Sequence, residues 1–356
     1  MQYNILVLNL GSTSTKVAIY NNLTNIAEDT LSHPAEETVK PMAEQIEYRL
    51  DAILSFLAEQ KFDPSSIDIV SARGGTLRPI EGGTYNISPQ MVSDLSESAY
   101  GRHASNMSGL IADRFRKKYG CEAVITDPVV VDELIDEVRM TGLKGIERKS
   151  IFHALNQKAV ARKYAESVNK EYGDINVIIC HMGGGITAGA HHRGRVIDVN
   201  DGLSGEGPMS PNRTGSLPNG AFAKYIIDNR LDYDAAYEVI TKEGGFISLA
   251  GTQDALELEN RALDGDSPAI AIYEAMAVQI AKEIGSRAAI LKGEAEQIIF
   301  TGGLAYSKYL IDLIRPYVSF IAPITVYPGE EEMSALAEGA YRVMSGEESV
   351  KTYEQE

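Results

Sequence analysis

The sequence has few cysteines, no long apolar run and too few basic residues to balance its acidic ones. Its 33 Lys and Arg against 50 Asp and Glu give a formal net charge of −17. This charge disfavours a nucleic-acid partner, because binding a phosphate backbone requires a basic surface. No apolar run approaches the roughly 18 residues of a membrane-spanning helix, so we expect no membrane partner either.

The scarcity of cysteine bears on the compartment. Cys121 and Cys180 form no C-x-x-C pair, which indicates a reducing environment without a disulfide framework. The N-terminus has no basic region before its short apolar run, so no secretory signal is evident. We therefore expect a cytoplasmic protein, and 356 residues allow two domains with a core each.

A turn of small residues between two apolar runs, at residues 5–20, is the first candidate site. The pattern predicts a β-hairpin, and Gly11 allows its backbone to approach a ligand closely. Successive N–H groups in such a turn form a nest for anions. Ser12 and Ser14 add hydroxyl groups and Lys16 adds a positive charge. The turn favours nucleotide phosphates, and an ordinary hairpin turn is the alternative.

A second pattern of this kind occurs at residues 177–192, about half a chain later. Its turn contains a histidine and three glycines: His181, Gly183, Gly184 and Gly185. Two similar hairpins at this separation suggest a duplicated domain with one phosphate-binding turn in each copy.

A third pattern is the apolar run at 297–301 followed by Gly302 and Gly303. A strand that ends in this way often brings its backbone close to a flat or anionic ligand. Strand patterns and helix patterns alternate along the chain, which favours the α/β class.

Two arginines stand in glycine-containing loops. Arg73 precedes two glycines, and Arg213 lies in the segment Pro-Asn-Arg-Thr-Gly. Phosphoryl transfer needs cations and hydrogen-bond donors more than covalent help. Loop arginines can hold a phosphate or carboxylate with two parallel hydrogen bonds. A solvated surface role is the alternative for either arginine.

Several motifs in a fixed order carry a family resemblance. They occupy residues 9–16, 71–75, 101–106, 126–128, 152–157, 181–185, 209–216 and 329–332. In this order they make the chain similar to the short-chain carboxylate kinases of the actin, hexokinase and heat-shock chaperone superfamily. Within that family it most resembles the members that phosphorylate butyrate.

The resemblance implies an α/β fold of two duplicated domains, actin-like and ribonuclease-H-like ATPase modules with an interdomain cleft. We expect the first domain at residues 1–147, with the C-terminal helix 334–356 packing back on it, and the second at 148–333. The activity implied is direct, reversible transfer from ATP to butyrate, with ATP/ADP and Mg²⁺ as cofactors. The partners expected are these small molecules and further copies of the chain, as a homodimer or larger homo-oligomer.

The resemblance also implies roles for individual residues. Arg73 and Arg213 are expected to flank the transferring phosphoryl group. His181 is expected to stabilise the transition state, and His103 matches a second family histidine. Asp127 is expected to orient an arginine or a metal-bound water, with a plain turn aspartate as the alternative.

Glu331 is the residue that we expect to be associated with Mg²⁺, with Glu332 the next choice and Asn9 helping to position the metal. Acidic residues at a helix N-terminus are favourable without any ligand, so a structural role is the alternative. A third family histidine falls at Gln157, whose amide can donate a hydrogen bond but carries no charge.

The acid's chain length is inferred from Gly75, where acetate kinases typically carry valine. Its small size is expected to leave room for additional methylenes, each worth about 0.8 kcal/mol when buried. A pocket separates acids that differ by one methylene by only about 10- to 200-fold. Branched-chain acid, propionate or acetate kinase activity is therefore an alternative. A further alternative is an actin-like ATPase with a structural or partner-cycling role, which would not require the two loop arginines.

Overall fold

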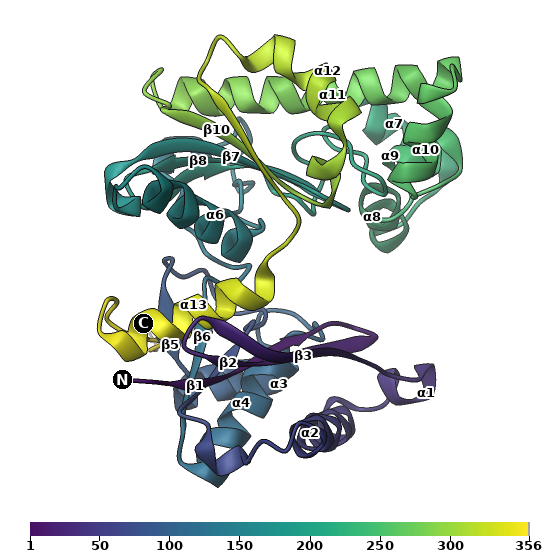
Figure 1. Ribbon diagram of the computed structural model, residues 1–356. Coiled ribbons are helices and arrows are strands. Elements are labelled where there is room, and N and C mark those ends of the chain that lie inside the picture. The colour runs from purple at the N-terminus through teal and green to yellow at the C-terminus, as the bar shows by residue number, and fades with distance from the viewer. Residues whose placement is uncertain (355–356) are drawn as a thin grey trace. The chain divides into compact units, whose positions relative to one another are not determined.

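The computed structural model describes residues 1–354. The chain forms two compact units, unit 1 from Met1–Val131 with Glu331–Glu356, and unit 2 from Asp132–Glu330. Each unit combines a sheet with helices, so the α/β prediction is confirmed (Figure 1). The sequence predicts domain boundaries after residues 147 and 333, and these boundaries stay a prediction.

Unit 1 contains a 7-stranded sheet in the order β12-β5-β6-β4-β1-β2-β3. Its strands are β1 (Asn4–Leu10), β2 (Ser14–Asn21), β3 (Thr24–Ser32), β4 (Ile69–Ala72), β5 (Thr84–Asn86), β6 (Glu122–Thr126) and β12 (Lys351–Thr352). Its helices are α1 (Ala35–Thr38), α2 (Met42–Glu59), η1 (Pro64–Ser66), α3 (Pro89–Glu97), α4 (Asn106–Tyr119) and α13 (Glu332–Ser345).

Unit 2 contains a 5-stranded sheet in the order β11-β10-β7-β8-β9. Its strands are β7 (Asn176–Met182), β8 (Ile186–His192), β9 (Arg195–Val199), β10 (Gln297–Gly302) and β11 (Ile324–Pro328). Its helices are α5 (Asp136–Arg139), α6 (Ala154–Ser167), η2 (Tyr172–Asp174), α7 (Asn219–Asn229), α8 (Tyr233–Thr241), α9 (Gly245–Ala250), α10 (Ala255–Leu263), α11 (Ser267–Ile290), η3 (Gly303–Tyr306) and α12 (Lys308–Val318).

The two sheets repeat one arrangement of strands. In unit 1, β1, β2 and β3 pair antiparallel, while β4 lies parallel to β1 and β6 parallel to β4. In unit 2, β7, β8 and β9 pair antiparallel, while β10 lies parallel to β7 and β11 parallel to β10. The duplication inferred from the glycine turns is therefore present in the topology, and each turn joins the first two strands of its sheet.

Strand alternation determines which side chains face which layer. In β1, Leu6 and Leu8 belong to the core that includes α2 and α4. Because successive side chains point to opposite faces of a strand, Asn9 faces the other side, where α13 packs against β1, β4 and β6. In unit 2, α11 and α12 cover one face of the sheet and α6 the other (Figure 1). No helix within residues 1–354 combines the length and apolarity needed to cross a bilayer.

Candidate active site

The first glycine turn joins β1 to β2 in unit 1, as predicted. The N–H group of Gly11 donates to the carbonyl of Ser14 at 2.9 Å, which closes the turn. A Cβ at Gly11 would meet nothing nearer than that carbonyl at 3.7 Å, so packing does not require glycine here. The side chains of Ser12 and Lys16 are exposed. The turn therefore presents a hydroxyl and an ammonium group to solvent.

Asn9, Arg73 and Glu332 form a polar cluster beside this turn. Asn9 Nδ2 donates to Glu332 Oε2 at 2.6 Å, and Arg73 Nη1 donates to Asn9 Oδ1 at 3.1 Å. Arg73 Nη2 lies 3.4 Å from Glu332 Oε1, and the arginine side chain is 42% exposed. Such an exposed ion pair is weak, so an incoming anion can compete for Arg73. The structure thus brings Arg73 next to Asn9, two residues that were predicted for different roles.

The three glutamates at the start of α13, Glu330, Glu331 and Glu332, have different surroundings. Glu332 contacts Asn9, whereas Glu331 occupies the N-cap position, where its carbonyl accepts from the Ser334 hydroxyl at 2.9 Å. Glu330 belongs to unit 2, with its Oε1 3.2 Å from Nε2 of His181. Glu332 is therefore the glutamate next to Asn9, and the association of Glu331 with Mg²⁺ stays a prediction.

His103 lies in the same unit as Arg73. The Ser105 N–H donates to His103 Nδ1 at 3.2 Å, which assigns the ring proton to Nε2. Burial and the charge of Arg73 lower the pKa of His103. The imidazole is therefore neutral at pH 7 and can donate one hydrogen bond through Nε2.

Asp127 directly follows β6 and has an unusual backbone conformation. It is fully buried and has a φ of 40°, in a region that few residues other than glycine adopt. Its Oδ1 accepts the N–H of Gly83 at 2.7 Å. Backbone outliers of this kind concentrate at functional sites, and the hydrogen bond to Gly83 shows what holds this one in place.

The sequence predicts open space beside Gly75, but the structure has none in the direction in which a side chain would point. A Cβ there would lie 2.7 Å from Asn106 Cα and 2.8 Å from Leu95 Cδ2. The fully buried Asn106 fixes this loop, because its Oδ1 accepts from Thr76 N at 2.9 Å. Glycine is thus required for the close approach of the loop to α4, and only its backbone remains available to a substrate.

The second glycine turn joins β7 to β8 in unit 2, again as predicted. Gly183 N–H donates to the carbonyl of Gly185 at 3.0 Å, and the Ser210 hydroxyl donates to the carbonyl of Gly184 at 2.6 Å. A Cβ at Gly185 would overlap the guanidinium of Arg213. The glycine therefore lets this arginine lie against the turn backbone.

His181 precedes that turn and is 1% exposed. Its Nδ1 lies 2.8 Å from Asn156 Oδ1, and its Nε2 has no hydrogen bond of acceptable geometry, although Glu330 is close. His153 stacks on it, with ring centroids 3.7 Å apart and planes at 11°. A histidine whose Nδ1 is held by an amide oxygen carries its proton there. Nε2 is then left to interact with a ligand.

A chain of hydrogen bonds runs behind this histidine pair. Gln157 Nε2 donates to Thr187 Oγ1 at 2.9 Å, so the Thr187 hydroxyl hydrogen is directed to His153 Nδ1, 2.9 Å away. Gln157 Oε1 lies 3.0 Å from His191 Nε2, and His191 Nδ1 lies 2.8 Å from the Tyr172 hydroxyl. Burial lowers the pKa of His191 well below its usual value, so it is neutral. Gln157 thus acts through hydrogen bonds within unit 2.

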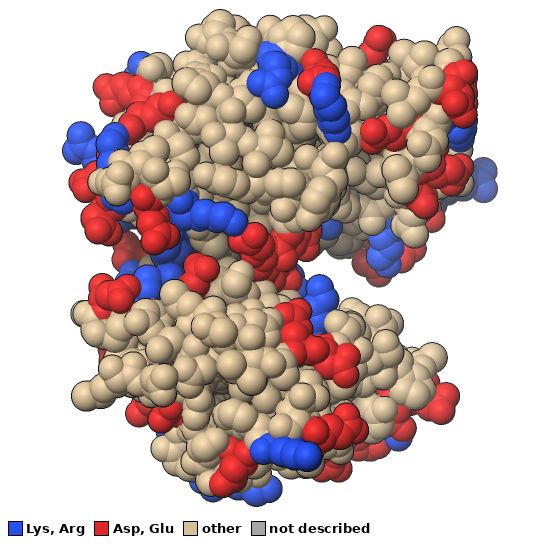
Figure 2. Space-filling model, viewed as in Figure 1, with Lys and Arg blue, Asp and Glu red and all other residues tan. Residues whose placement is uncertain are grey.

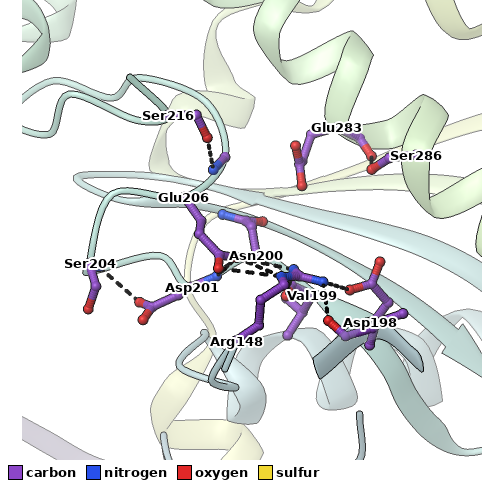
Figure 3. Close-up of polar contacts among 12 residues, drawn as sticks. Arg148, Asp198, Val199, Asn200, Asp201, Ser204, Glu206, Ser216, Glu283 and Ser286 are labelled. Atoms are coloured by element: carbon purple, nitrogen blue, oxygen red, sulfur yellow. Dashed lines mark hydrogen bonds and ion pairs between the residues drawn. The ribbon is translucent and has the colours of Figure 1, made fainter. Parts of the chain in front are cut away.

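Arg213 lies in a loop that is anchored by another arginine. Arg148 contacts Asp198, Glu206 and the carbonyl of Val199, as Figure 3 shows. Arg213 Nη1 donates to the carbonyl of Gly202 in the same loop, and its buried Nε has no partner among residues 1–354.

The anchoring network continues through Asp201, whose Oδ1 accepts from Ser204 N (Figure 3) and also from Leu203 N. Burial lowers the pKa of Arg213, but an arginine stays protonated. The result is a fixed, half-buried cation next to the second turn.

Gly302 and Gly303 follow β10. Gly302 has a φ of 87°, and a Cβ there would overlap the backbone of Met182 in β7. Gly302 therefore allows β10 to end close to β7. Gly303 begins η3, and a Cβ there would meet nothing within 4 Å. The backbone after β10 is thus open on one side, as a ligand contact requires.

Charge on the surface gives no general attraction for an anion. Asp and Glu side chains are spread over both units on the face shown in Figure 2, with Lys and Arg among them. The net charge of −17 repels a nucleotide at long range. Capture of an anionic substrate therefore depends on local groups such as Arg73, Lys16 and the turn N–H groups.

Sequence reasoning missed three residues that support the site. His153 stacks on His181, Asn156 fixes the His181 ring, and Ser210 holds the second turn. His153 and Asn156 lie within the motif at 152–157, in which only Gln157 was assigned a possible role. Their spacing along the first turn of α6 was the available signal.

The chain is similar to known proteins in sequence and in fold. Residues 139–314 match the model of the acetokinase family. Butyrate kinase 2 of Clostridium acetobutylicum is 48% identical over 355 residues, which cover 99% of this chain and 100% of the relative.

Two solved structures share the fold. An acetate kinase from Porphyromonas gingivalis matches with a TM-score of 0.78 and 19% identity, over 96% of this chain and 100% of that one. A propionate kinase from Francisella tularensis matches with a TM-score of 0.73 and 18% identity, over 95% of this chain and 98% of that one. The expected fold of two duplicated ATPase modules is thereby confirmed.

Proposed function

The chain belongs to the acetokinase family, and from this premise we propose that it is an ATP-dependent kinase that phosphorylates butyrate. The reaction is ATP + butyrate = ADP + butyryl phosphate, and it is reversible. The observation that carries the proposal is the similarity to a butyrate kinase along nearly the whole chain. The enzyme is a phosphotransferase with a carboxyl group as acceptor.

A carboxylate acceptor explains which chemical groups the protein provides. A short-chain acid has a pKa of roughly 4 to 5, so it is already an ionised nucleophile at neutral pH. It needs no general base, unlike the hydroxyl group of a sugar. The main barrier is repulsion between the carboxylate and the γ-phosphate, which cations and hydrogen-bond donors reduce. Arginines and histidines at glycine turns meet that requirement.

Unit 1 supplies a phosphate turn and a cation. In this proposal the N–H groups at Ser12 and Ser14, with Lys16, bind phosphate oxygens of ATP, and Gly11 lets the turn backbone approach them. Arg73 exchanges its weak pairing with Glu332 for a bidentate contact to the substrate carboxylate or the phosphoryl group. His103 donates through Nε2 as a neutral imidazole.

Unit 2 supplies the second turn and its histidines. The backbone at Gly183, Gly184 and Gly185 binds nucleotide phosphate. Arg213 stabilises the charge that develops on the transferring phosphoryl group. His181 contributes when its Nε2 also carries a proton, because only an N–H group can donate to a phosphoryl oxygen, and His153 supports the His181 ring by stacking. Gly302 and Gly303 line the nucleotide through their backbone. Asp127 keeps its proposed role as a site carboxylate.

Mg²⁺ is proposed as a companion of ATP. Among residues 1–354 no group of three or more His, Cys, Asp or Glu side chains is arranged to hold a metal alone. The Asn9 amide oxygen and the Glu332 carboxylate are oxygen donors of the kind that Mg²⁺ prefers, and Mg²⁺ commonly uses one or two protein groups beside phosphates and water. When bound, it would neutralise phosphate charge, with Asn9 and Glu332 holding it and Glu331 as the second choice.

Preference for butyrate over its relatives rests on resemblance and not on an open pocket at Gly75. Because discrimination by one methylene is only about 10- to 200-fold, we expect propionate, valerate and branched acids to react more slowly. Propionate and acetate kinase activity remain the alternative functions. We further propose a cytoplasmic location, since ATP is the co-substrate, and a homodimer or larger homo-oligomer, as the family resemblance implies.

An acyl hydroxamate assay tests the proposal directly. Purified protein with MgATP and a panel of C2 to C5 acids is trapped with hydroxylamine, and acyl phosphate formation is measured, with glucose and glycerol as hydroxyl controls. We expect butyrate to give the highest kcat/KM. Phosphorylation of glucose or glycerol without any acyl phosphate would contradict the assignment. ATP hydrolysis that is independent of added acid would favour the actin-like alternative.

A further inference from the structure

Arg49 lies inside unit 1 without a carboxylate to neutralise it. It shares the apolar face of α2 with Ile46 and Ile53, and it is 1% exposed. Within residues 1–354 it makes no ion pair. A buried guanidinium is costly unless its N–H groups are hydrogen-bonded. Its bonding partners therefore explain why an arginine is placed there.

All of its hydrogen bonds go to the first glycine turn and the residue after it. Nη2 donates to the carbonyl of Ser12 at 2.9 Å. Nη1 donates to the carbonyl of Ser14 at 3.0 Å and to Thr15 Oγ1 at 3.1 Å. One planar guanidinium thus holds three positions of the turn from behind. A lysine cannot reproduce this, because its ammonium lacks the fixed fork.

The carbonyls of the turn are consequently directed into the protein. Arg49 binds that of Ser12, and the His33 N–H donates to that of Thr13 at 2.9 Å. In a trans peptide the C=O and N–H groups point in opposite directions. Holding the Ser12 carbonyl inward therefore turns the Thr13 N–H outward. Within residues 1–354 no backbone acceptor receives the N–H of Ser12 or Thr13.

We propose that Arg49 is a positioning residue that holds the first turn so that its N–H groups meet a phosphate group of ATP. The inference rests on the proposed function, in which this turn binds the nucleotide. Arg49 touches neither substrate nor reacting atoms. Its effect is on the free-energy cost of ordering the turn, so it changes the binding of phosphate and not that of the nucleoside.

The test compares a phosphate-bearing nucleotide with one that has no phosphate. Arg49→Lys is prepared in the full chain, and calorimetry measures Kd for AMPPNP and for adenosine. We expect Kd for AMPPNP to rise about 10-fold while Kd for adenosine stays within twofold. In kinetics, KM for ATP rises by a similar factor and KM for butyrate stays within twofold. A general loss of structure would raise KM for both substrates, so a rise in KM for ATP alone indicates a specific effect on the turn.

Arg287→Lys is the matched control. Arg287 is a buried arginine of unit 2 at 3% exposure, and it binds Asp198 and the carbonyl of Ala188. This variant is expected to lower the melting temperature without changing the ratio of the two Kd values. This control distinguishes the effect of losing a buried guanidinium in general from the effect of losing the contact with the turn.

Two outcomes overturn the inference: unchanged AMPPNP affinity in folded Arg49→Lys, or equal weakening for AMPPNP and adenosine. If Arg49→Lys does not fold, Thr15→Val replaces it. This change removes one acceptor of Arg49 and retains the side-chain shape, with an expected rise of about threefold and the same criteria. Wild-type protein that makes no acyl phosphate contradicts the proposed function, whereas active wild type with an unaffected variant contradicts the role of Arg49 alone.

Discussion

The two glycine hairpins occupy the same place in two sheets of the same topology, yet they are held in different ways. The turn of unit 1 is supported by Arg49 from α2. The turn of unit 2 is supported by the small hydroxyl of Ser210, while its arginine, Arg213, lies against Gly185. One hairpin has its arginine behind the turn, and the other has an arginine beside the turn backbone.

The two hairpins nevertheless share one arrangement of a threonine and a histidine. Each second strand carries a fully buried threonine whose hydroxyl lies close to a histidine nitrogen, Thr15 with His33 at 2.8 Å and Thr187 with His153 at 2.9 Å. In unit 1 that histidine is structural, whereas in unit 2 it stacks on His181. The duplicated frame has thus been retained while the polar groups beside the turns have diverged, so a buried arginine supports the turn of unit 1 and a stacked histidine pair lies beside the turn of unit 2.

Removal of the arginines should have the largest effect on activity. Arg213→Ala and Arg73→Ala are each expected to lower kcat about 10²-fold or more, as loss of a preorganised charge does. Lysine should restore little, because it cannot make the forked contact. Steady-state kinetics with butyrate measures this, and circular dichroism confirms folding. Near-normal kcat in both folded alanine variants would remove the arginines from the mechanism.

Adding a methyl group to one glycine of each turn should affect activity differently in the two hairpins. Gly185→Ala places a Cβ on the Arg213 guanidinium and must displace it, so we expect kcat to fall about 10- to 100-fold. Gly11→Ala meets no atom nearer than 3.7 Å and should keep activity within a few-fold. Both proteins should melt near the wild-type temperature, since an arginine end can move. Equal losses in the two variants would mean that the turns are not held differently.

Gln157 tests the hydrogen-bond chain behind the histidine pair of unit 2. Gln157→Leu keeps the volume but removes the donor that directs the Thr187 hydroxyl to His153, so the His153 ring loses its fixed proton position. We expect kcat to fall about 10-fold with KM for both substrates nearly unchanged. Tyr172→Phe, which alters only the far end of the chain, should have a smaller effect. A larger loss in Tyr172→Phe than in Gln157→Leu would contradict this order.

Local pattern predicted the parts of the structure that depend on sequence neighbours. Both hairpins, the α/β class and the duplication follow from apolar runs interrupted by glycine, since a glycine turn between such runs has few other solutions. The loop positions of Arg73 and Arg213 were likewise visible. These features need no information about residues distant in the chain.

Contacts between distant segments could not be predicted in the same way. Glu332 meets Asn9 across 323 positions, and neighbouring glutamates look alike in sequence, so Glu331 was chosen. Gly75 was taken as a vacancy because glycine is small, whereas Asn106 and Leu95 fill the space. Arg49 was absent from the prediction, because an arginine in a helix normally faces solvent. Each case depends on packing that periodicity does not encode.

The smallest expected effect concerns pH and the structural histidine of unit 1. Burial, with the charge of Arg49 second, lowers the pKa of His33 to about 4, and the edge of Tyr48 also packs against its ring. In the unfolded chain this histidine titrates near 6.5, so between pH 6.5 and 4 the unfolded state binds the extra proton. The free energy of unfolding should therefore decrease as the pH falls through this window, by at most about 1.4 kcal/mol per pH unit for one group.

His33→Gln keeps an acceptor for the Thr15 hydroxyl but cannot titrate, so its urea midpoint should change less between pH 7 and pH 5 than that of the wild type. An identical change in the two proteins would show that His33 is protonated in the folded state, and the neutral acceptor assigned to it beneath the first turn would then be wrong.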